Sequence, residues 1–351
     1  MKILSLFDGM ACGALAMQSA GIEIDKYIAY EIDKYAIQTA QHNFPFIEER
    51  GDVFKADFKE YAGFDYLIGG SPCTYWSIAQ TKNRETVASG MGWELFSQYV
   101  RALHEAKPRF FLYENNKSMS AAIRASITET FGFEPILINS ALVSAQNRQR
   151  LYWCGIRQAD GTYKKADIQQ PADRGILLKD ILETNAVTWL EKAYTYTTRC
   201  QGAIIENTLE KHQHTMVAEP ICVNSKSGRA GVEGLQPSLQ DRVYDTAGKM
   251  PALTTSFNPR IAEPVCVAQR SRYDAPIYEV KDGFITVKGN KYPIKLVDGF
   301  YIIRKLTVRE CMRLQTVPEW YEWPVSKSQA YKMLGNGWTV EVIAHLLRGL
   351  K

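Results

Sequence analysis

The chain has 351 residues, of which 46% are hydrophobic and 23% are charged, an ordinary composition for a soluble globular protein. This length predicts one large domain and a smaller one, and the net charge of +4 permits an anionic partner without requiring one. The seven cysteines are scattered and include no Cys-x-x-Cys pair, so neither a disulfide framework nor a zinc cluster is indicated. The first apolar residues are too few for a signal peptide, and no apolar run reaches membrane-spanning length. We therefore expect a cytoplasmic protein.

The chain opens with a strand candidate, Lys2 to Phe7, followed by the turn Asp8 to Gly13 and an alanine-rich helix that ends near Ala20. A strand, a glycine turn and a helix in this order are typical of nucleotide-binding folds, because glycine lets the backbone approach a ligand. Many α/β turns have the same pattern, so this one alone predicts little.

Two further turns carry carboxylates at strand ends. The second strand, Lys26 to Tyr30, ends at Glu31, and a carboxylate there suits a pair of ribose hydroxyls. A helix from about Lys34 to Asn43 follows it. A third turn contains Asp52, whose carboxylate could lie beside an adenine amino group. Together the three turns favour a nucleoside-type cofactor.

Cys73 follows a buried strand candidate, Phe64 to Ile68, and a Gly-Gly-Ser-Pro turn. This position, just past a strand end, is where open α/β sheets bind ligands. A lone cysteine is more often a small apolar residue of the core, so Cys73 needs matching partners. The polar segment from Ile78 to Gly92 is either a loop that closes over substrate or an ordinary exposed connection.

A carboxylate also lies at the tip of the next strand. A helix from Trp93 to Glu105 leads to the strand Arg109 to Tyr113, after which comes Glu114. If this strand neighbours the one before Cys73, the thiol and the carboxyl meet in one crevice, as a nucleophile with an acid partner.

Two arginines precede an aromatic strand candidate, after a helix from Ala121 to Phe131 and a strand near Ile136 to Asn139. In an extended segment Arg148 and Arg150 point to the same side. Two guanidiniums together need acceptors, and a carboxylate, a phosphate or a base carbonyl would serve. Two arginines that face solvent are the alternative.

Helical periodicity fades from about Thr184 to Tyr301, where short β-like runs alternate with turn residues. Helix signals then return. Thr307 and Glu310 form a capping-box pattern, the helical stretch Gln329 to Leu334 is broken by Gly335-Asn336-Gly337, and an apolar helix covers Val340 to Leu347. Asn336 either offers its amide to a cofactor or satisfies the turn.

Taken together, these motifs resemble those of the DNA cytosine-C5 methyltransferases of bacterial and phage type. Six segments carry the resemblance in the usual order of that family, and together they are far more specific than any one alone. They are Phe7-Asp8-Gly9-x-x-x-Gly13, Ser71-Pro72-Cys73, Glu114-Asn115, Gln146-x-Arg148-x-Arg150, Arg304 to Leu314 and Gly335-Asn336.

The resemblance implies an α/β fold, namely the Rossmann-like sheet of S-adenosylmethionine-dependent methyltransferases, mostly parallel with helices on both faces. Residues 1–183 would form the catalytic and cofactor-binding domain. Residues 184–301 would form a smaller β-rich target recognition domain, and residues 302–351 would complete the catalytic domain.

The same resemblance implies methyl transfer from S-adenosyl-L-methionine to C5 of a flipped-out cytosine in a specific duplex DNA sequence, leaving S-adenosyl-L-homocysteine. Cys73 would bond to C6 of the base, Glu114 would engage N3, and Arg148 and Arg150 would support the site and the base O2. The cofactor pocket would be lined by Phe7, Asp8, Gly9, Gly13, Glu31, Ile32, Asp52, Val53, Pro72, Leu95, Asn336 and Trp338. No metal is implied.

Side-chain chemistry suggests readers of the DNA sequence within the β-rich region, because arginine pairs well with guanine and glutamine with adenine. The candidates are Arg229, Gln240, Arg242, Thr254 and Arg260.

The chain departs from the family pattern at several positions. Ala11 replaces a common glycine, Thr74 a glutamine, Asn116 a valine, and Gly337-Trp338 the usual Ser-Val. None of these changes removes a group that the chemistry needs.

Three other functions compete with this interpretation. A tRNA cytosine-C5 methyltransferase would use the same site, and a catalytically silent DNA-binding homologue would keep the fold. An amino-methylating enzyme would carry an Asp/Asn-Pro-Pro-Tyr turn, which the sequence lacks. We expect a monomer that acts on double-stranded DNA without a membrane, with a cognate restriction endonuclease left open as a partner.

Overall fold

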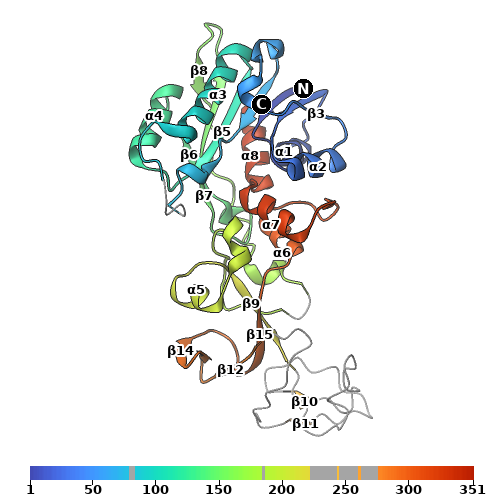
Figure 1. Ribbon diagram of the computed structural model, residues 1–351, viewed down its shortest axis with the longest axis vertical. Helices are drawn as coiled ribbons and strands as arrows, with labels where there is room; N and C mark the ends of the chain where they lie inside the picture. The colour runs from blue at the N-terminus through green and yellow to red at the C-terminus, as the bar shows by residue number, and fades with distance from the viewer. Residues whose placement is uncertain (79–83, 184–185, 222–242, 245–259, 262–275) are drawn as a thin grey trace. The chain divides into compact units, whose positions relative to one another are not determined.

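The computed structural model describes residues 1–78, 84–183, 186–221, 243–244, 260–261 and 276–351. It divides into two compact units, one of Met1–Ile176 with Cys311–Lys351 and one of Leu177–Glu310. The sequence placed the corresponding boundaries after residues 183 and 301. Each unit is described by itself (Figure 1).

The first unit is built on one sheet with the strand order β3-β2-β1-β4-β5-β7-β6, and β8 pairs with β7. The strands from β3 to β5 in this order are parallel, whereas β7 runs antiparallel to β5, β6 and β8. The predicted mostly parallel sheet is therefore confirmed. The strands are β1 (Lys2–Leu6), β2 (Lys26–Tyr30), β3 (Ile47–Glu49), β4 (Tyr66–Gly69), β5 (Phe110–Asn116), β6 (Ile136–Asn139), β7 (Gln149–Arg157) and β8 (Tyr163–Lys165).

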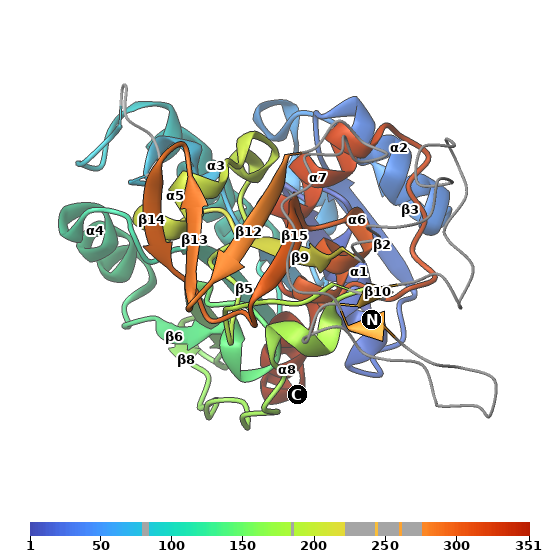
Figure 2. The ribbon, with the colours of Figure 1, turned by 90° about the horizontal axis from the view of Figure 1, so that it is seen from below.

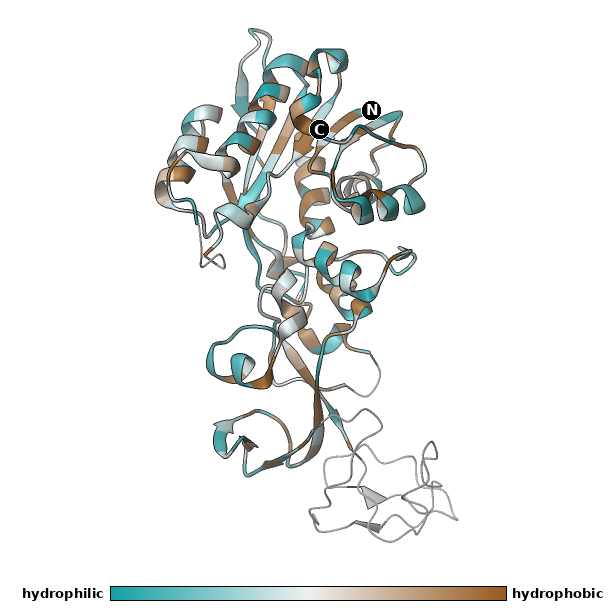
Figure 3. Ribbon diagram, in the orientation of Figure 1, coloured by the Kyte–Doolittle hydropathy of each residue, from teal (hydrophilic) through white to brown (hydrophobic). Residues whose placement is uncertain are grey.

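Helices cover both faces of this sheet, with α3 and α4 on one side and α1, α2 and α8 on the other (Figure 1). The central strands are apolar, as expected for parallel strands that are buried on both faces (Figure 3). The helices of this unit are α1 (Cys12–Ser19), α2 (Lys34–Asn43), α3 (Gly90–Ala106), α4 (Ala121–Phe131), α7 (Lys327–Asn336) and α8 (Val340–Leu350). Short 3₁₀ segments are η1 (Val53–Lys55), η2 (Phe58–Tyr61), η3 (Cys73–Tyr75) and η4 (Ser140–Leu142).

Three helices extend beyond their predicted ends. Helix α8 continues to Leu350 rather than Leu347. In the other two, a side chain from outside the helix satisfies the backbone. Helix α3 begins at Gly90 rather than Trp93, and both oxygens of the Glu85 carboxylate accept from the amide of Gly92 at 3.2 Å. Helix α7 continues to Asn336, so Gly335 does not break it. Its last carbonyls accept hydrogen bonds from Gln315 and Arg148.

Aromatic packing fixes the two strands that carry the candidate site. The ring of Tyr99 on α3 packs against Tyr113 on β5, and its hydroxyl donates to the carbonyls of Leu67 and Leu112 at 3.2 and 2.8 Å. One side chain thus joins β4 to β5 in the core.

The second unit is β-rich, as predicted, with the five-stranded sheet order β14-β13-β12-β15-β9, and Figure 2 shows β12 to β15 side by side. Its strands are β9 (Met216–Pro220), β10 (Val243–Tyr244), β11 (Arg260–Ile261), β12 (Ile277–Lys281), β13 (Phe284–Val287), β14 (Asn290–Pro293) and β15 (Gly299–Lys305). Its helical segments are η5 (Leu178–Ile181), η6 (Thr198–Gly202) and α5 (Ile205–Glu210), and α6 (Val308–Leu314) begins here.

The predicted capping box at the start of α6 is confirmed. The Glu310 amide donates to the Thr307 hydroxyl at 3.1 Å, and the Thr307 amide donates to the Glu310 carboxylate at 2.8 Å. Burial alone would raise the pKa of Glu310, but hydrogen bonds from Arg304 and the backbone hold that pKa below its usual value. Arg304 also pairs with Glu219 on β9, so this ion network, in which Glu310 is buried, ties the strand pair to the helix.

No helix in the described part of the chain combines the length and the apolar character needed to cross a membrane.

Candidate active site

Cys73 and Glu114 leave the same edge of the sheet. Strands β4 and β5 are parallel neighbours, with Gly69 opposite Tyr113, so both chains emerge from the sheet together. Cys73 begins the 3₁₀ turn η3, and its free thiol is half-buried rather than sealed in the core. The interpretation of Cys73 as a core residue therefore does not hold.

Hydrogen bonds tie the Cys73 loop to the tip of β5. The side-chain amide of Asn115 donates from Nδ2 to the carbonyl of Ser71 at 3.2 Å, and the hydroxyls of Ser71 and Tyr113 lie 2.7 Å apart. Gly70 leaves room for this approach, because a Cβ atom there would lie 2.7 Å from the carbonyl oxygen of Glu114 and 2.9 Å from its Oε2. The loop and the strand tip thus form one packed unit.

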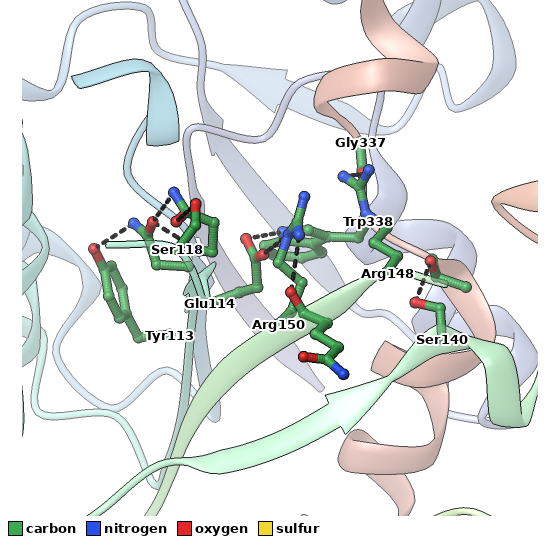
Figure 4. Close-up of polar contacts among 12 residues, drawn as sticks. Tyr113, Glu114, Ser118, Ser140, Arg148, Arg150, Gly337 and Trp338 are labelled. Atoms are coloured by element: carbon green, nitrogen blue, oxygen red, sulfur yellow. Dashed lines mark hydrogen bonds and ion pairs between the residues drawn. The ribbon is translucent and has the colours of Figure 1, made fainter. Parts of the chain in front are cut away.

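The carboxylate of Glu114 is held by two donors from different parts of the chain (Figure 4). Arg150 Nε on β7 lies 3.1 Å from Oε1, and the indole Nε1 of Trp338 donates to Oε2 at 3.0 Å. Both side chains of the ion pair are largely buried, with 14% of Arg150 and 13% of Glu114 exposed. Both oxygens of the carboxylate therefore have fixed partners.

The two arginines play different structural parts. Arg148 is 3% exposed, and its guanidinium donates to the carbonyls of Gly335 and Gly337 at 3.3 and 2.8 Å. Burial, together with the charge of Arg150, lowers the pKa of Arg148 to about 10, while the charges of Glu114 and Cys73 oppose the shift. Arg148 thus lies within electrostatic range of the thiol while it holds the chain before Trp338.

The first turn presents backbone amides at the end of β1. Gly9 has φ +62°, and its amide donates to Glu31 Oε2 at 2.9 Å. Ala11, which replaces the glycine common in the family, adopts the same left-handed conformation with φ 60°. A Cβ atom on Gly9 would meet nothing within 4 Å, so open space lies beside this turn.

Acidic side chains gather near that space. Asp8 is buried and accepts hydrogen bonds from Ser5 and Tyr27 through Oδ1, and burial raises its pKa to about 6. Within the described residues, its Oδ2 atom is buried without a hydrogen-bond partner. Glu49, at the end of β3, is a residue that the sequence analysis missed, and burial together with the charges of Asp8 and Glu31 raises its pKa to about 8. A single acidic residue on a three-residue strand gives no local sequence signal that its carboxylate is buried beside other carboxylates.

This turn fits a cofactor that carries a ribose and a positive charge. Glu31 Oε1 already accepts from two backbone amides, but Oε2 accepts only from Gly9 and can take one more hydrogen bond. The Gly9 backbone leaves room, and the Asp8 Oδ2 atom, which has no partner among the described residues, suits a positive group.

The other predicted cofactor residues lie in several places. Gly13 is inside α1, where a Cβ atom would lie 2.5 Å from the hydroxyl of Tyr27, so packing also requires this glycine. Asp52 caps η1, Val53 is buried, and Ile32 is 77% exposed. Phe7 is half-buried with φ 58°, Pro72 is exposed before Cys73, Leu95 is half-buried on α3, and Asn336 is exposed at the end of α7.

In the segment from Ile78 to Gly92, the described residues Arg84 and Glu85 are anchored by hydrogen bonds. Arg84 donates to the carbonyls of Trp76 and Ser118, and Glu85 accepts from the Trp76 indole at 3.0 Å. Whether this segment closes over substrate stays a prediction.

The predicted readers of DNA sequence lie where side chains are not described. Arg229, Gln240, Arg242 and Thr254 are outside the described residues, and only the backbone of Arg260, in β11, is described. Among the described residues, no group of histidine, cysteine and acidic side chains has a metal-binding arrangement.

The family model described as "C-5 cytosine-specific DNA methylase" matches residues 1–351. The chain belongs to this family. It is a DNA cytosine-5-methyltransferase, as the sequence motifs predicted.

Relatives of this methyltransferase come from phages and bacteria. The orphan methyltransferase M.SPRI of Bacillus phage SPR is 26% identical over 100% of this chain and 97% of its own length. The type II methyltransferase M.FnuDI of Fusobacterium nucleatum is 26% identical over 100% and 94%.

Solved structures share the fold of this methyltransferase. Dnmt2 methyltransferase of S. pombe has a TM-score of 0.54 and 16% identity, over 100% of this chain and 98% of that chain. A putative DNA modification methyltransferase encoded within an E. coli prophage has a TM-score of 0.54 and 20% identity, over the same shares.

Proposed function

We propose that this methyltransferase transfers a methyl group from S-adenosyl-L-methionine to C5 of a cytosine flipped out of a specific duplex DNA sequence, through a covalent bond between Cys73 and C6. The observation that carries the proposal is the contact between the loop bearing Cys73 and the carboxylate of Glu114, at the end of adjacent strands. A nucleophile and an acid held side by side can act on two atoms of one ring.

Cytosine C5 is a poor nucleophile while the ring stays conjugated. Addition of the Cys73 sulfur to C6 breaks that conjugation and makes C5 electron-rich. Glu114, by giving a proton or strong hydrogen bond to N3, stabilises the charge that develops on the ring. After C5 takes the methyl group, loss of its hydrogen to a base and departure of the thiolate restore the aromatic ring.

The arginines support this chemistry in distinct ways. Arg148 holds the carbonyls of Gly335 and Gly337 and so supports the segment that carries Trp338. Arg150 orients the Glu114 carboxylate through Nε and donates from Nη1 to the Gln149 carbonyl, and its Nη2 group would donate to the base O2. A base inside a stacked duplex could not reach Cys73 or Glu114, so the target base must be flipped out.

S-adenosyl-L-methionine, when bound, supplies the methyl group as a sulfonium, and S-adenosyl-L-homocysteine is the product. Glu31, the Gly9 backbone and Asp8 would hold its ribose and amino group, while Asp52, Val53, Ile32 and Trp338 would line the rest. We assign double-stranded DNA as the partner and residues 184–301 as the target recognition domain. We also propose a monomer that acts in the bacterial cytoplasm, alone or beside a restriction endonuclease of the same specificity.

Replacement of the nucleophile tests the proposal. We expect Cys73→Ala to bind S-adenosyl-L-methionine and duplex DNA like the wild type and to form no 5-methylcytosine, measured by mass spectrometry of hydrolysed bacterial DNA. Cys200→Ala removes another half-buried thiol and serves as the matched control. Robust 5-methylcytosine formation by Cys73→Ala would overturn the assignment, and methylation of tRNA but not of duplex DNA would change the substrate class.

A further inference from the structure

Trp338 contacts Glu114 through the one polar atom of its indole ring. Nε1 donates to Glu114 Oε2 at 3.0 Å, while Arg150 engages the other oxygen. In Figure 4 the guanidinium of Arg150 meets the carboxylate from β7, and the indole of Trp338 meets it from the segment after α7. A cofactor wall needs only the face of the ring, so this hydrogen bond calls for a separate explanation.

The backbone around Trp338 is held by buried groups. On one side, the Gly337 carbonyl accepts from Arg148 at 2.8 Å, and the Gly337 amide donates to the Met333 carbonyl at 2.7 Å. On the other side, the buried hydroxyl of Thr339 donates to Gln315 Oε1 at 2.9 Å. The indole therefore extends from a fixed support, and its N–H occupies a preorganised position.

The carboxylate also has little room to move. A Cβ atom on Gly70 would lie 2.9 Å from Oε2, so the Cys73 loop closes one side. Without the indole N–H, Oε2 would lose the donor that opposes the pull of Arg150 on Oε1, and the carboxyl group could rotate about its terminal bond, whose torsion is broad.

We propose that Trp338 is a positioning residue for Glu114, with its indole N–H setting the orientation in which the carboxyl group meets cytosine N3. This inference rests on the proposed role of Glu114. It gives Trp338 a part in the chemical step, in addition to the predicted part in lining the cofactor pocket. It also explains the buried Arg148, which supports the segment that presents the indole.

Trp338→Phe tests the inference, because phenylalanine keeps an aromatic face but has no N–H to donate. We expect the single-turnover rate of methyl transfer to DNA to fall roughly 10- to 100-fold, the range for a slightly misplaced catalytic group. The KM for S-adenosyl-L-methionine and the thermal unfolding temperature should stay close to wild type. Trp323→Phe is the control, since its half-buried indole also donates a hydrogen bond, to the sulfur of Met312 at 3.2 Å.

A double-mutant cycle separates positioning of Glu114 from any other effect. In a Glu114→Gln background, Trp338→Phe should change the residual rate by no more than about twofold, because the group it orients is already altered. Equal losses in both backgrounds would overturn the inference. So would a raised KM for S-adenosyl-L-methionine with an unchanged single-turnover rate.

The proposed function has its own readout in the same experiments. If the wild-type enzyme forms 5-methylcytosine and Trp338→Phe is as fast, the inference about Trp338 is wrong and the proposed function stands. If the wild-type enzyme forms no 5-methylcytosine, both the proposed function and the inference are wrong.

Discussion

At the scale of single residues, the site depends on Gly70, which has no side chain, as much as on the side chains of Cys73 and Glu114. Gly70 lies between the end of β4 and Cys73, and the backbone and carboxylate of Glu114 occupy the space where its Cβ would be. The nearest of these atoms belongs to the backbone of β5, which cannot swing aside like a flexible side chain. The approach of the Cys73 loop to Glu114 is thus set by the smallest residue of the loop.

Gly70→Ala should therefore impair catalysis without preventing folding. The added methyl group must push the Cys73 loop away from Glu114, and a displacement of about 1 Å costs on the order of 100-fold in rate. The single-turnover methyl-transfer rate measures this loss, and calorimetric titration should show nearly unchanged affinity for S-adenosyl-L-methionine. Gly202→Ala is the matched control, because a Cβ there meets nothing within 4 Å. A Gly70→Ala enzyme as fast as the control would mean that the loop and the strand tip need not touch.

At the scale of secondary-structure elements, the strand ends gather three carboxylates, and burial makes two of them, Asp8 and Glu49, costly to ionise. Strand β3 carries Glu49 beside Asp8, at the end of β1, and Glu31, at the end of β2. Both carboxylate oxygens of Glu49 are buried, without a hydrogen-bond partner within the described residues. In the absence of a cationic ligand, such a cluster opposes folding when its members are charged.

Glu49→Gln should stabilise the cofactor-free protein at high pH only. The folded-state pKa of Glu49 is raised from 4.5 to about 8, so the folded protein holds the extra proton and loses stability as pH rises through this window. We expect the variant to unfold several degrees higher than wild type at about pH 9 and at the same temperature at about pH 4.5, as measured by scanning calorimetry.

Glu48→Gln is the control for that comparison, because it removes the same charge from the exposed neighbouring position. A Glu49→Gln variant that differs from wild type equally at both pH values would show that Glu49 is not buried as a proton-holding acid.

At the scale of the whole molecule, local patterns in the sequence predicted much of the fold. The observed ranges of β2, α2, α4 and β6 coincide with the predicted ones, since each is bounded by clear turn or capping residues. Ordered motifs also identified the family. The sequence left open whether the strands before Cys73 and Glu114 are neighbours, and the structure pairs them.

What the sequence did not predict depends on contacts between distant segments. Strands β3 and β8 are only three residues long, too short for a periodic signal, and the antiparallel direction of β7 comes from sheet pairing. The hydrogen bond from Trp338 to Glu114 joins residues 224 positions apart. The charges that meet at Glu49 likewise come from three strands. Local sequence patterns contain no information on such contacts.

The measurement that tests the account most directly is covalent trapping on DNA in which 5-fluorocytosine replaces cytosine. Fluorine at C5 cannot leave as the hydrogen does, so the bond from Cys73 to C6 should persist after methyl transfer. Fragments of several thousand base pairs will contain the recognised sequence, whatever it is. With S-adenosyl-L-methionine present, we predict that peptide mapping finds the nucleotide mass increment on the peptide carrying Cys73. Methylation of ordinary cytosine DNA without any such adduct, or an adduct on a different cysteine, would contradict the account.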